Sequence, residues 1–239
     1  MTEFEPSKLG TRAHWDDVYE KEVANFEETG DEGEIWFGED CVEKMVDWTL
    51  ENVPIPSHPQ ILEIGSGNGT LLFALRDAGY AAPHLSGIDY SPDAVRLARM
   101  VAQTRNSEQI TFHVCDFLSE PAPPPAAAVS GGQSLDDLEG SWDLLLDKGT
   151  YDAIALGEKD GSGSSPVAAY PVRASKLLRE NGYLLITSCN FTEDELRASF
   201  VNPETNFHFH SHVKHPSISF GGQSGSVYTT VAFKKEILG

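Results

Sequence analysis

The chain has 239 residues, of which 40% are hydrophobic, and its formal net charge is −20 at pH 7. This length suits one enzyme-sized domain with a full core, predicted over residues 1–239, and no run of 18 apolar residues indicates a membrane span. The acidic excess disfavours direct nucleic-acid binding, because neutralising phosphates requires basic residues. The acidic amino terminus also lacks a signal-peptide pattern, so we expect a soluble intracellular protein without membrane association.

The amino-terminal quarter carries most of the negative charge. Residues 1–60 contain 16 acids and 4 bases, which gives −12 for this segment. Such a surface either attracts a basic partner or only keeps the protein soluble, and composition leaves both readings open. We predict a helical segment over 1–55, with helices at 16–23 and 40–50. Trp36 and Phe37 lie between them, and either anchor the segment in the core or close over a ligand.

The most informative pattern follows a buried strand predicted at residues 61–64. Gly65, Gly67 and Gly69 come directly after it, and glycines at this spacing let the backbone turn sharply and approach a ligand closely. In a dinucleotide-binding motif the third glycine would stand at position 70, where this chain has Thr70, so the pattern argues against NAD as the ligand. Glu63 also places a carboxylate at the strand's end, which suits a cationic ligand better than a pyrophosphate. The pattern resembles the first motif of class I S-adenosylmethionine-dependent methyltransferases.

Two further predicted strands, at 86–89 and 110–115, end at acidic residues. Asp89 stands 24 residues after Gly65, near the spacing at which a carboxylate holds a ribose diol. Asp116 follows the next strand, and in the methyltransferase pattern it lies beside the adenine amino group. Each acid alone is more often a helix cap or turn residue, but acids at the ends of consecutive strands indicate a crevice. Ser91 is expected to cap the following helix, with Pro92 in its first position.

The second half of the chain continues the alternation of strands and helices. We predict strands at 142–147 and 183–188, a helix at 167–181 between them, and a helix opened by a capping box at Thr192 and Glu195. Residues 120–140 are rich in proline, alanine and glycine and are predicted to form a flexible insertion. Two terminal strands, at 207–214 and 227–233, should pair antiparallel around a turn-rich stretch. The expected fold is therefore α/β: a Rossmann-like seven-stranded methyltransferase sheet, mostly parallel with an antiparallel C-terminal hairpin, and helices on both faces.

Histidines and cysteines give no metal site. His208, His210 and His212 alternate along one predicted strand and are interpreted as its solvent face, since no acid or cysteine is placed to complete a site. The three cysteines form no Cys-x-x-Cys pair and are expected to be buried, reduced residues.

Methyl transfer from a sulfonium is an in-line displacement, so the protein must mainly position the nucleophile and exclude water. The ends of the fourth and fifth strands should border the methyl group. Asp147 and Tyr151 are candidates for binding an incoming amine, and Asn190 for orienting it. A turn with strand-end caps is the alternative interpretation of these residues.

Six segments together resemble the eukaryotic translation elongation factor 1-alpha lysine methyltransferase family. They are residues 9–16, 33–39, 87–92, 147–152, 186–190 and 219–225. The resemblance implies a cytoplasmic protein-lysine N-methyltransferase that uses S-adenosylmethionine and acts on the elongation factor. The longer 120–140 and 157–165 loops are the departures from the pattern. The expected cofactor-binding residues are Trp36, Glu63, Gly65, Gly67, Asn68, Gly69, Asp89, Tyr90, Asp116 and Phe117.

Two alternatives to this function remain open at this point. The first alternative is a class I methyltransferase whose acceptor is a small molecule or a different protein, because a fold alone does not fix the substrate. The other alternative is an inactive methyltransferase-like binding module, which the intact set of glycines and acids disfavours.

Overall fold

The structure is a computed structural model that describes residues 4–125, 140–159, 161, 163, 165–215, 217–220 and 223–236, without the side chains of residues 217–226. Its main feature is a seven-stranded sheet with the order β3-β2-β1-β4-β5-β9-β6. The first five of these strands run parallel, and β9 pairs antiparallel with both β5 and β6. The strands are β1 (Ile61–Ile64), β2 (Leu85–Asp89), β3 (Thr111–Val114), β4 (Trp142–Lys148), β5 (Leu178–Ser188), β6 (Phe207–Val213) and β9 (Thr229–Lys235). The predicted fold class is confirmed.

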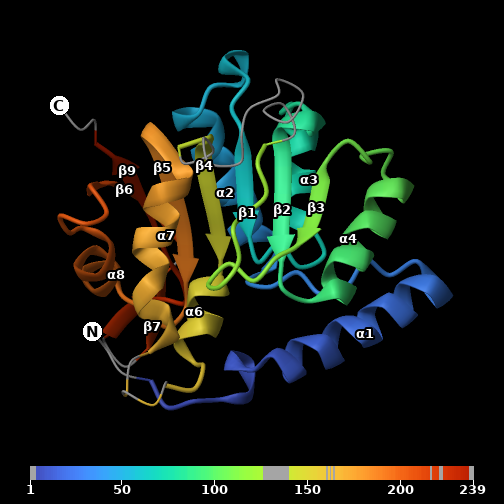
Figure 1. The fold of residues 1–239 in the computed structure, drawn as a ribbon, viewed down its shortest axis with the longest axis horizontal. Helices are drawn as coiled ribbons and strands as arrows, with labels where there is room; N and C mark the ends of the chain where they lie inside the picture. The colour runs from blue at the N-terminus through green and yellow to red at the C-terminus, as the bar shows by residue number, and fades with distance from the viewer. Residues whose placement is uncertain are drawn as a thin grey trace.

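Helices cover both faces of this sheet (Figure 1). The α-helices are α1 (Arg12–Thr29), α2 (Gly38–Asn52), α3 (Thr70–Asp77), α4 (Pro92–Thr104), α6 (Thr150–Ala155), α7 (Tyr170–Leu177) and α8 (Glu193–Phe200). Short 3₁₀ turns lie at η1 (Lys8–Gly10), η2 (Ile55–Ser57), η3 (Ala82–His84) and η5 (Pro166–Ala169). None of the described helices is both long and apolar enough to cross a membrane.

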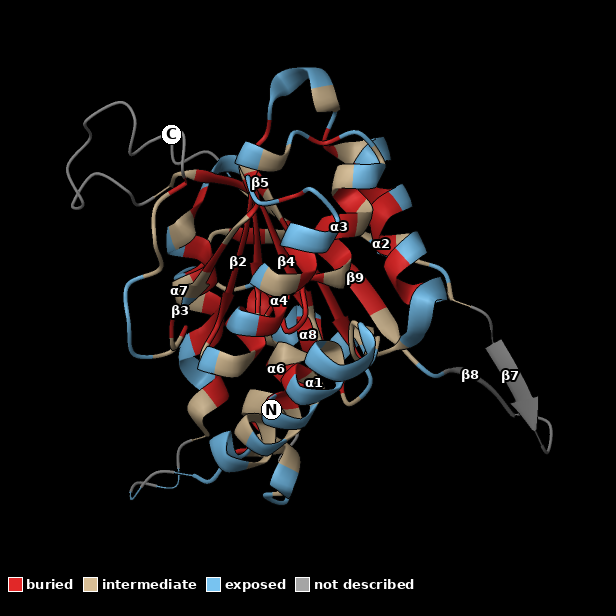
Figure 2. Ribbon diagram, turned by 90° about the vertical axis from the view of Figure 1, so that its right-hand side faces the viewer, coloured by how far each residue is buried: buried red, intermediate tan, exposed pale blue. Residues whose placement is uncertain are grey.

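Alternate strand residues divide the core into two layers. Leu144 and Leu146 of β4 belong to the layer that packs on α2, α3 and α4, whereas Leu145 belongs to the layer that packs on α6, α7 and α8. This division follows from the two-residue period of a strand. It explains why the central strands are apolar on both faces, as expected for a covered parallel sheet. Figure 2 shows the buried strands between helices whose outer surfaces are exposed.

Several boundaries differ from the sequence predictions. The helix predicted to reach residue 181 ends at Leu177, because Leu178 already pairs with Trp142 at the start of β5. Asn181 adopts a positive φ of 62° in the irregular part of that strand. The stretch predicted as turn-rich contains a separate two-stranded sheet, β7 (Ser217–Phe220) and β8 (Gln223–Ser226). The capping box at Thr192 and Glu195 is confirmed.

The 120–140 insertion falls mostly outside the described residues. The predicted amino-terminal helical segment contains η1, α1 and α2, and α1 is longer than expected. In Figure 1, α1 runs across the end of the molecule toward which the parallel strands point. Two ion pairs, Arg96 to Glu27 and Arg105 to Glu32, join the α1 region to the α4 region. The amino-terminal segment is thereby held over the carboxyl ends of the strands.

Candidate active site

The glycine turn after β1 lies under two other elements. Gly65, Gly67 and Gly69 have φ values of 67°, 52° and 82°, a backbone region that residues other than glycine rarely adopt. A Cβ atom on Gly65 would lie 2.0 Å from the Thr150 hydroxyl, and one on Gly67 would lie 2.5 Å from the Tyr19 hydroxyl. Both glycines are therefore required by the close approach of α6 and α1 as well as by backbone conformation.

Asp89 fixes the position of this turn. One carboxylate oxygen accepts a hydrogen bond of 3.0 Å from the Gly67 amide, and the other accepts one of 2.9 Å from the Ser91 amide. The Ser91 hydroxyl makes no cap, contrary to expectation; it is buried without a hydrogen-bond partner among the described residues. Burial raises the pKa of Asp89 to about 6.

Two adjoining pockets open where the strand order reverses between β1 and β4, the position at which α/β sheets bind ligands. The first, here called the β4–β5 pocket, has a cavity volume of about 160 Å³ and includes Trp36, Lys148, Asp152 and Asn190 in its wall. The second, the β2–β3 pocket, has a cavity volume of about 350 Å³. Gly65, Asp89, Tyr90 and Thr150 are among the residues that line both. Their shared wall makes the two pockets one continuous site.

Most of the predicted cofactor residues come together here. Trp36, Gly65, Gly67, Asn68, Asp89 and Tyr90 line the β4–β5 pocket, and Asp116 and Phe117 line the β2–β3 pocket with Asp89 and Tyr90. Gly69 lines neither pocket; it is the N-cap of α3, where a Cβ atom would lie 2.8 Å from the Phe112 ring.

Glu63 lies just below this surface. Glu63 is 2% exposed, and its Oε2 has no hydrogen-bond partner within the described residues. Burial raises the pKa of Glu63 to about 8, while the positive charge of Lys148 opposes the shift. An unpartnered carboxylate oxygen next to a glycine turn fits a ligand that brings a positive charge.

The structure does not bring Asp147 or Tyr151 to either pocket wall. Asp147 is fully buried and accepts hydrogen bonds from the Thr150 and Tyr151 amides and from the Tyr170 hydroxyl. The Tyr151 ring is also fully buried, in an aromatic cluster with Tyr170, Phe191 and Phe200. This geometry gives both residues a structural role around the first turn of α6 and does not favour contact with an amine. Asn190, the third catalytic candidate, does line the β4–β5 pocket.

The amino-terminal segment contributes residues for which the sequence predicted no role. Leu9, Trp15 and Tyr19 line the β4–β5 pocket. The Trp15 indole donates to the Leu9 carbonyl at 2.7 Å, and its ring packs edge-on against Trp36 at 4.9 Å between centroids. Trp15 falls in the 9–16 segment that carried the family resemblance, which was the available signal. Nothing in the helical pattern of α1 indicates that Tyr19 faces a pocket.

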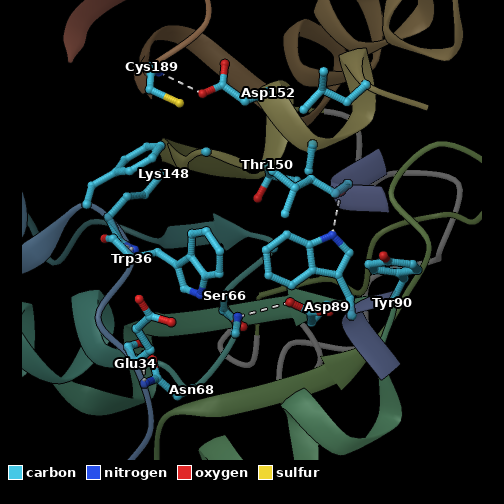
Figure 3. A pocket seen from close by; sticks show the side chains of 18 of the residues that line it. Glu34, Trp36, Ser66, Asn68, Asp89, Tyr90, Lys148, Thr150, Asp152 and Cys189 are labelled. Atoms are coloured by element: carbon cyan, nitrogen blue, oxygen red, sulfur yellow. Dashed lines mark hydrogen bonds between the residues drawn. The ribbon is translucent and has the colours of Figure 1, made fainter. Parts of the chain in front are cut away.

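A second group lies at and after the ends of β4 and β5, which were expected to border the methyl group, although the sequence assigned no individual role to its members. Lys148, Asp152 and Cys189 line the β4–β5 pocket. Cys189 is exposed, contrary to the expectation of three buried cysteines, whereas Cys41 and Cys115 are buried. In Figure 3, Asp152 and Cys189 lie at the opposite side of the pocket from Asp89 and Tyr90.

The aromatic segment at Trp36 and Phe37 is held at three points. Lys148 Nζ donates to the Trp36 carbonyl at 3.1 Å, and Phe37 adopts a positive φ of 67° at the start of α2. Gly149 lets the Phe37 ring lie against β4, since a Cβ atom there would come within 2.9 Å of it. The Asn68 side chain donates to the carbonyls of Glu32 and Glu34 just before this segment. Because non-glycine residues with positive φ concentrate at functional sites, this segment fits a role in ligand binding.

Comparisons with known proteins identify the family. A family model described as a methyltransferase domain matches residues 55–235. The mouse protein named EEF1A lysine methyltransferase 2 is 37% identical over 233 residues, which cover 98% of this chain and 86% of the mouse protein. The chain belongs to the family of the EEF1A lysine methyltransferases. The Schizosaccharomyces pombe protein-lysine N-methyltransferase efm4 is 38% identical, with 98% of this chain and 97% of the relative covered.

Solved structures support the fold at lower identity. A TehB-like SAM-dependent methyltransferase from Corynebacterium glutamicum superposes with a TM-score of 0.56 at 14% identity, covering 95% of this chain and 100% of that one. At this identity the likeness shows only the fold. The lysine methyltransferase relatives therefore carry the functional comparison.

Proposed function

We propose that this protein is an S-adenosylmethionine-dependent protein-lysine N-methyltransferase that modifies a lysine of translation elongation factor 1-alpha. The observation that carries the proposal is the identity of 34–38% over at least 97% of the chain to relatives that are named as lysine methyltransferases. The proposed acceptor comes from the three of these names that mention EEF1A. The proposed chemistry also agrees with the charges and the layout of the pockets.

The residues of the two pockets fit S-adenosylmethionine. The unpartnered oxygen of Glu63 suits the positively charged methionine end, and the Asp89 carboxylate retains acceptor capacity for ribose hydroxyls after its two backbone bonds. Asp116 and Phe117 supply a polar group and an aromatic face in the β2–β3 pocket for an adenine ring. When bound, the cofactor supplies a methyl group on a sulfonium.

The protein's own contribution is orientation and exclusion of water. The glycine turn sets the floor of the site, and Asp89 holds this turn by its bond to Gly67. Trp15 and Trp36 provide a large apolar wall, which favours the exclusion of water from the site. Asn190 borders the same pocket and is proposed to orient the acceptor amine.

The family resemblance also implies a cytoplasmic location, which we propose for this chain. The elongation factor is then both substrate and transient partner. The acidic amino-terminal quarter, at −12 in 60 residues, favours the approach of a basic protein surface.

Transfer of tritiated methyl from S-adenosylmethionine into fractionated cell extract tests the proposal. We expect label in one protein band that antibodies to elongation factor 1-alpha recognise, and recovery of the label as methyl-lysine after hydrolysis. Label in the small-molecule fraction would replace the proposal with a small-molecule methyltransferase. No label from a protein that binds the cofactor would indicate an inactive binding module.

A further inference from the structure

The β4–β5 pocket contains one carboxylate that the sequence interpretation did not single out. Asp152 lies in α6, five residues after Asp147, and is 4% exposed. Its Oδ1 accepts a hydrogen bond of 2.5 Å from the Ser188 hydroxyl, and its Oδ2 accepts one of 2.7 Å from the Cys189 amide. Both donors come from the end of β5 and its first loop residue. The carboxylate is therefore held rigidly between two elements.

The position of Asp152 separates it from the end of the site that we assign to the nucleoside. It lines only the β4–β5 pocket, whereas Asp89 and Tyr90 line both pockets and Asp116 lines only the other. Figure 3 shows Asp152 across the pocket from Asp89. An acceptor amine must enter the site from a side that the nucleoside leaves open. Asp152 lies on that side.

The other carboxylates near this pocket lie outside its wall or at another end of it. Asp147 receives hydrogen bonds from two amides and one hydroxyl and is fully buried. Asp89 lines both pockets and belongs to the end of the site that we assign to the nucleoside. Glu34 lines the pocket from the segment before Trp36, on the amino-terminal side. Among the described residues that line this pocket, Asp152 is the carboxylate supplied by α6, beside the end of β5.

We propose that the Asp152 carboxylate binds the acceptor lysine amine in the β4–β5 pocket and stabilises the positive charge that develops on its nitrogen. Resting on the proposed function, this assignment replaces Asp147 as the acidic catalytic residue. Ser188 is then a positioning residue, because its hydroxyl acts on the amine only through Asp152.

The chemical step defines when this charge matters. The lone pair of the neutral lysine nitrogen forms a bond to the methyl carbon while the carbon–sulfur bond breaks and sulfur keeps the electron pair. The product nitrogen is a methylammonium, which passes its proton to solvent after release. A fixed carboxylate stabilises the nitrogen more as its positive charge grows, so its effect is larger in the transition state than in the ground state.

Two features of the surrounding pocket agree with this role. Lys148 places a cation in the same pocket, which favours the neutral form of an incoming lysine. The Trp36 and Phe37 rings line the pocket as well and offer aromatic surfaces to the aliphatic stem and to the developing cation.

The test compares Asp152→Asn with Asp147→Asn, which removes a nearby carboxylate at the end of β4, outside both pocket walls. Purified wild type and variants are assayed with S-adenosylmethionine and elongation factor 1-alpha; calorimetry gives cofactor affinity and thermal melting gives stability. We expect Asp152→Asn to lower kcat at least about tenfold while cofactor affinity changes less than about threefold. Asp147→Asn should retain kcat. Ser188→Ala should lower kcat by a smaller factor and leave the KM for cofactor unchanged.

Normal kcat in a folded Asp152→Asn protein would overturn the assignment, provided that the wild type methylates the elongation factor. A variant that loses cofactor binding and melts early would also overturn it, because Asp152 would then be a structural residue. If the wild type transfers no methyl group to the elongation factor or to any other protein, the proposed function and this assignment both fail. The wild-type measurement therefore separates the two failures.

Discussion

Lys148 reaches across the site and donates a hydrogen bond of 3.1 Å from Nζ to the carbonyl oxygen of Trp36, 112 residues earlier in the chain. This bond joins the end of β4 to the segment that carries two aromatic residues of the pocket. The same ammonium opposes the upward shift of the Glu63 pKa. Lys148 thus connects the aromatic wall with the charge beneath the glycine turn.

Lys148→Met keeps the aliphatic stem and removes the ammonium. We expect a loss of about 1 kcal/mol or more, because hydrogen bonds from charged groups are stronger than neutral ones, which corresponds to a fall in Tm of roughly 2–4 °C. Scanning calorimetry measures this. Lys44→Met is the control, since Lys44 forms an i,i+4 pair with Asp40 on the surface of α2 and such pairs contribute little. Equal falls in Tm for Lys148→Met and Lys44→Met would show that the hydrogen bond from Lys148 to Trp36 contributes no more stability than a surface ion pair.

Tyr19→Phe removes one hydroxyl that lies over the Gly67 turn and leaves the ring packed on Trp15. If this hydroxyl contacts the cofactor, its loss costs about 1 kcal/mol, and the Kd for S-adenosylmethionine should rise roughly fivefold. Titration calorimetry measures the Kd. The control is Tyr80→Phe, whose hydroxyl donates to the Val53 carbonyl outside both pockets and should affect stability alone. An unchanged Kd in Tyr19→Phe would show that the Tyr19 hydroxyl does not contribute to cofactor binding.

Asp89→Ala removes the carboxylate assigned to the ribose and also releases the Gly67 amide. The loss of charge-assisted bonds of about 1.5–3 kcal/mol should weaken cofactor binding by one to two decades. Asp93→Ala serves as a control, because Asp93 stands in the first turn of α4 outside both pockets. The assignment of Asp89 does not survive if a folded Asp89→Ala protein binds the cofactor as tightly as the control.

Three buried carboxyls make the stability of the protein depend on pH. Burial raises the pKa of Glu63 to about 8, of Asp147 to about 7 and of Asp89 to about 6. Between the unfolded values near 4 and these folded values, the folded protein holds more protons than the unfolded chain. The free energy of unfolding must therefore fall as pH rises from about 5 to 8.

Chemical denaturation at several pH values, without cofactor, measures this dependence. Glu63→Gln removes the group with the highest pKa, so the decline between about pH 7 and 8 should become shallower in this variant. A free energy of unfolding that rises over the same interval would mean that the carboxyls are ionised in the folded protein at lower pH.

Substrate capture should depend on salt through the acidic amino-terminal face. Exposed charges are screened beyond about 8 Å at physiological ionic strength, so kcat/KM for the protein substrate should fall as salt increases, mainly through the association rate. A double variant of the exposed residues Asp17 and Glu20 to Asn and Gln should weaken the dependence. A control double variant that changes Glu180 and Glu204 to Gln should leave the salt dependence unchanged, because these two residues are exposed outside both pockets. Flat profiles would leave the net charge of −20 as a solubility feature.

The fold and the cofactor end of the site were predictable because they depend on local patterns. An apolar strand, glycines that must adopt positive φ and an acid at the next strand's end each leave a signal within a few residues. Glu63, Asp89 and Asp116 could be proposed on these grounds, and Asp89 and Asp116 line the pockets.

The acceptor end was less predictable, because it depends on packing between distant segments. Asp147 and Asp152 are five residues apart; Asp147 lies at the end of β4, and Asp152 lies within the short helix α6 that follows. Asp147 turns inward because its carboxylate caps α6 and meets the hydroxyl of Tyr170, 23 residues away. Asp152 borders the pocket because β5 presents Ser188 and Cys189 to it. Tyr19 likewise reaches the site only because α1 is fastened across the strand ends, and no spacing in the sequence encodes that placement.

Mapping the modified residue on purified elongation factor 1-alpha tests the central claim most directly. The unmethylated factor is incubated with the wild-type protein and S-adenosylmethionine, and its peptides are analysed by mass spectrometry beside a reaction with Asp89→Ala. The account predicts methyl groups on a lysine side chain of the factor with the wild type, and far fewer with the variant at limiting cofactor. A factor that stays unmodified, while the same wild-type protein binds S-adenosylmethionine, would contradict it.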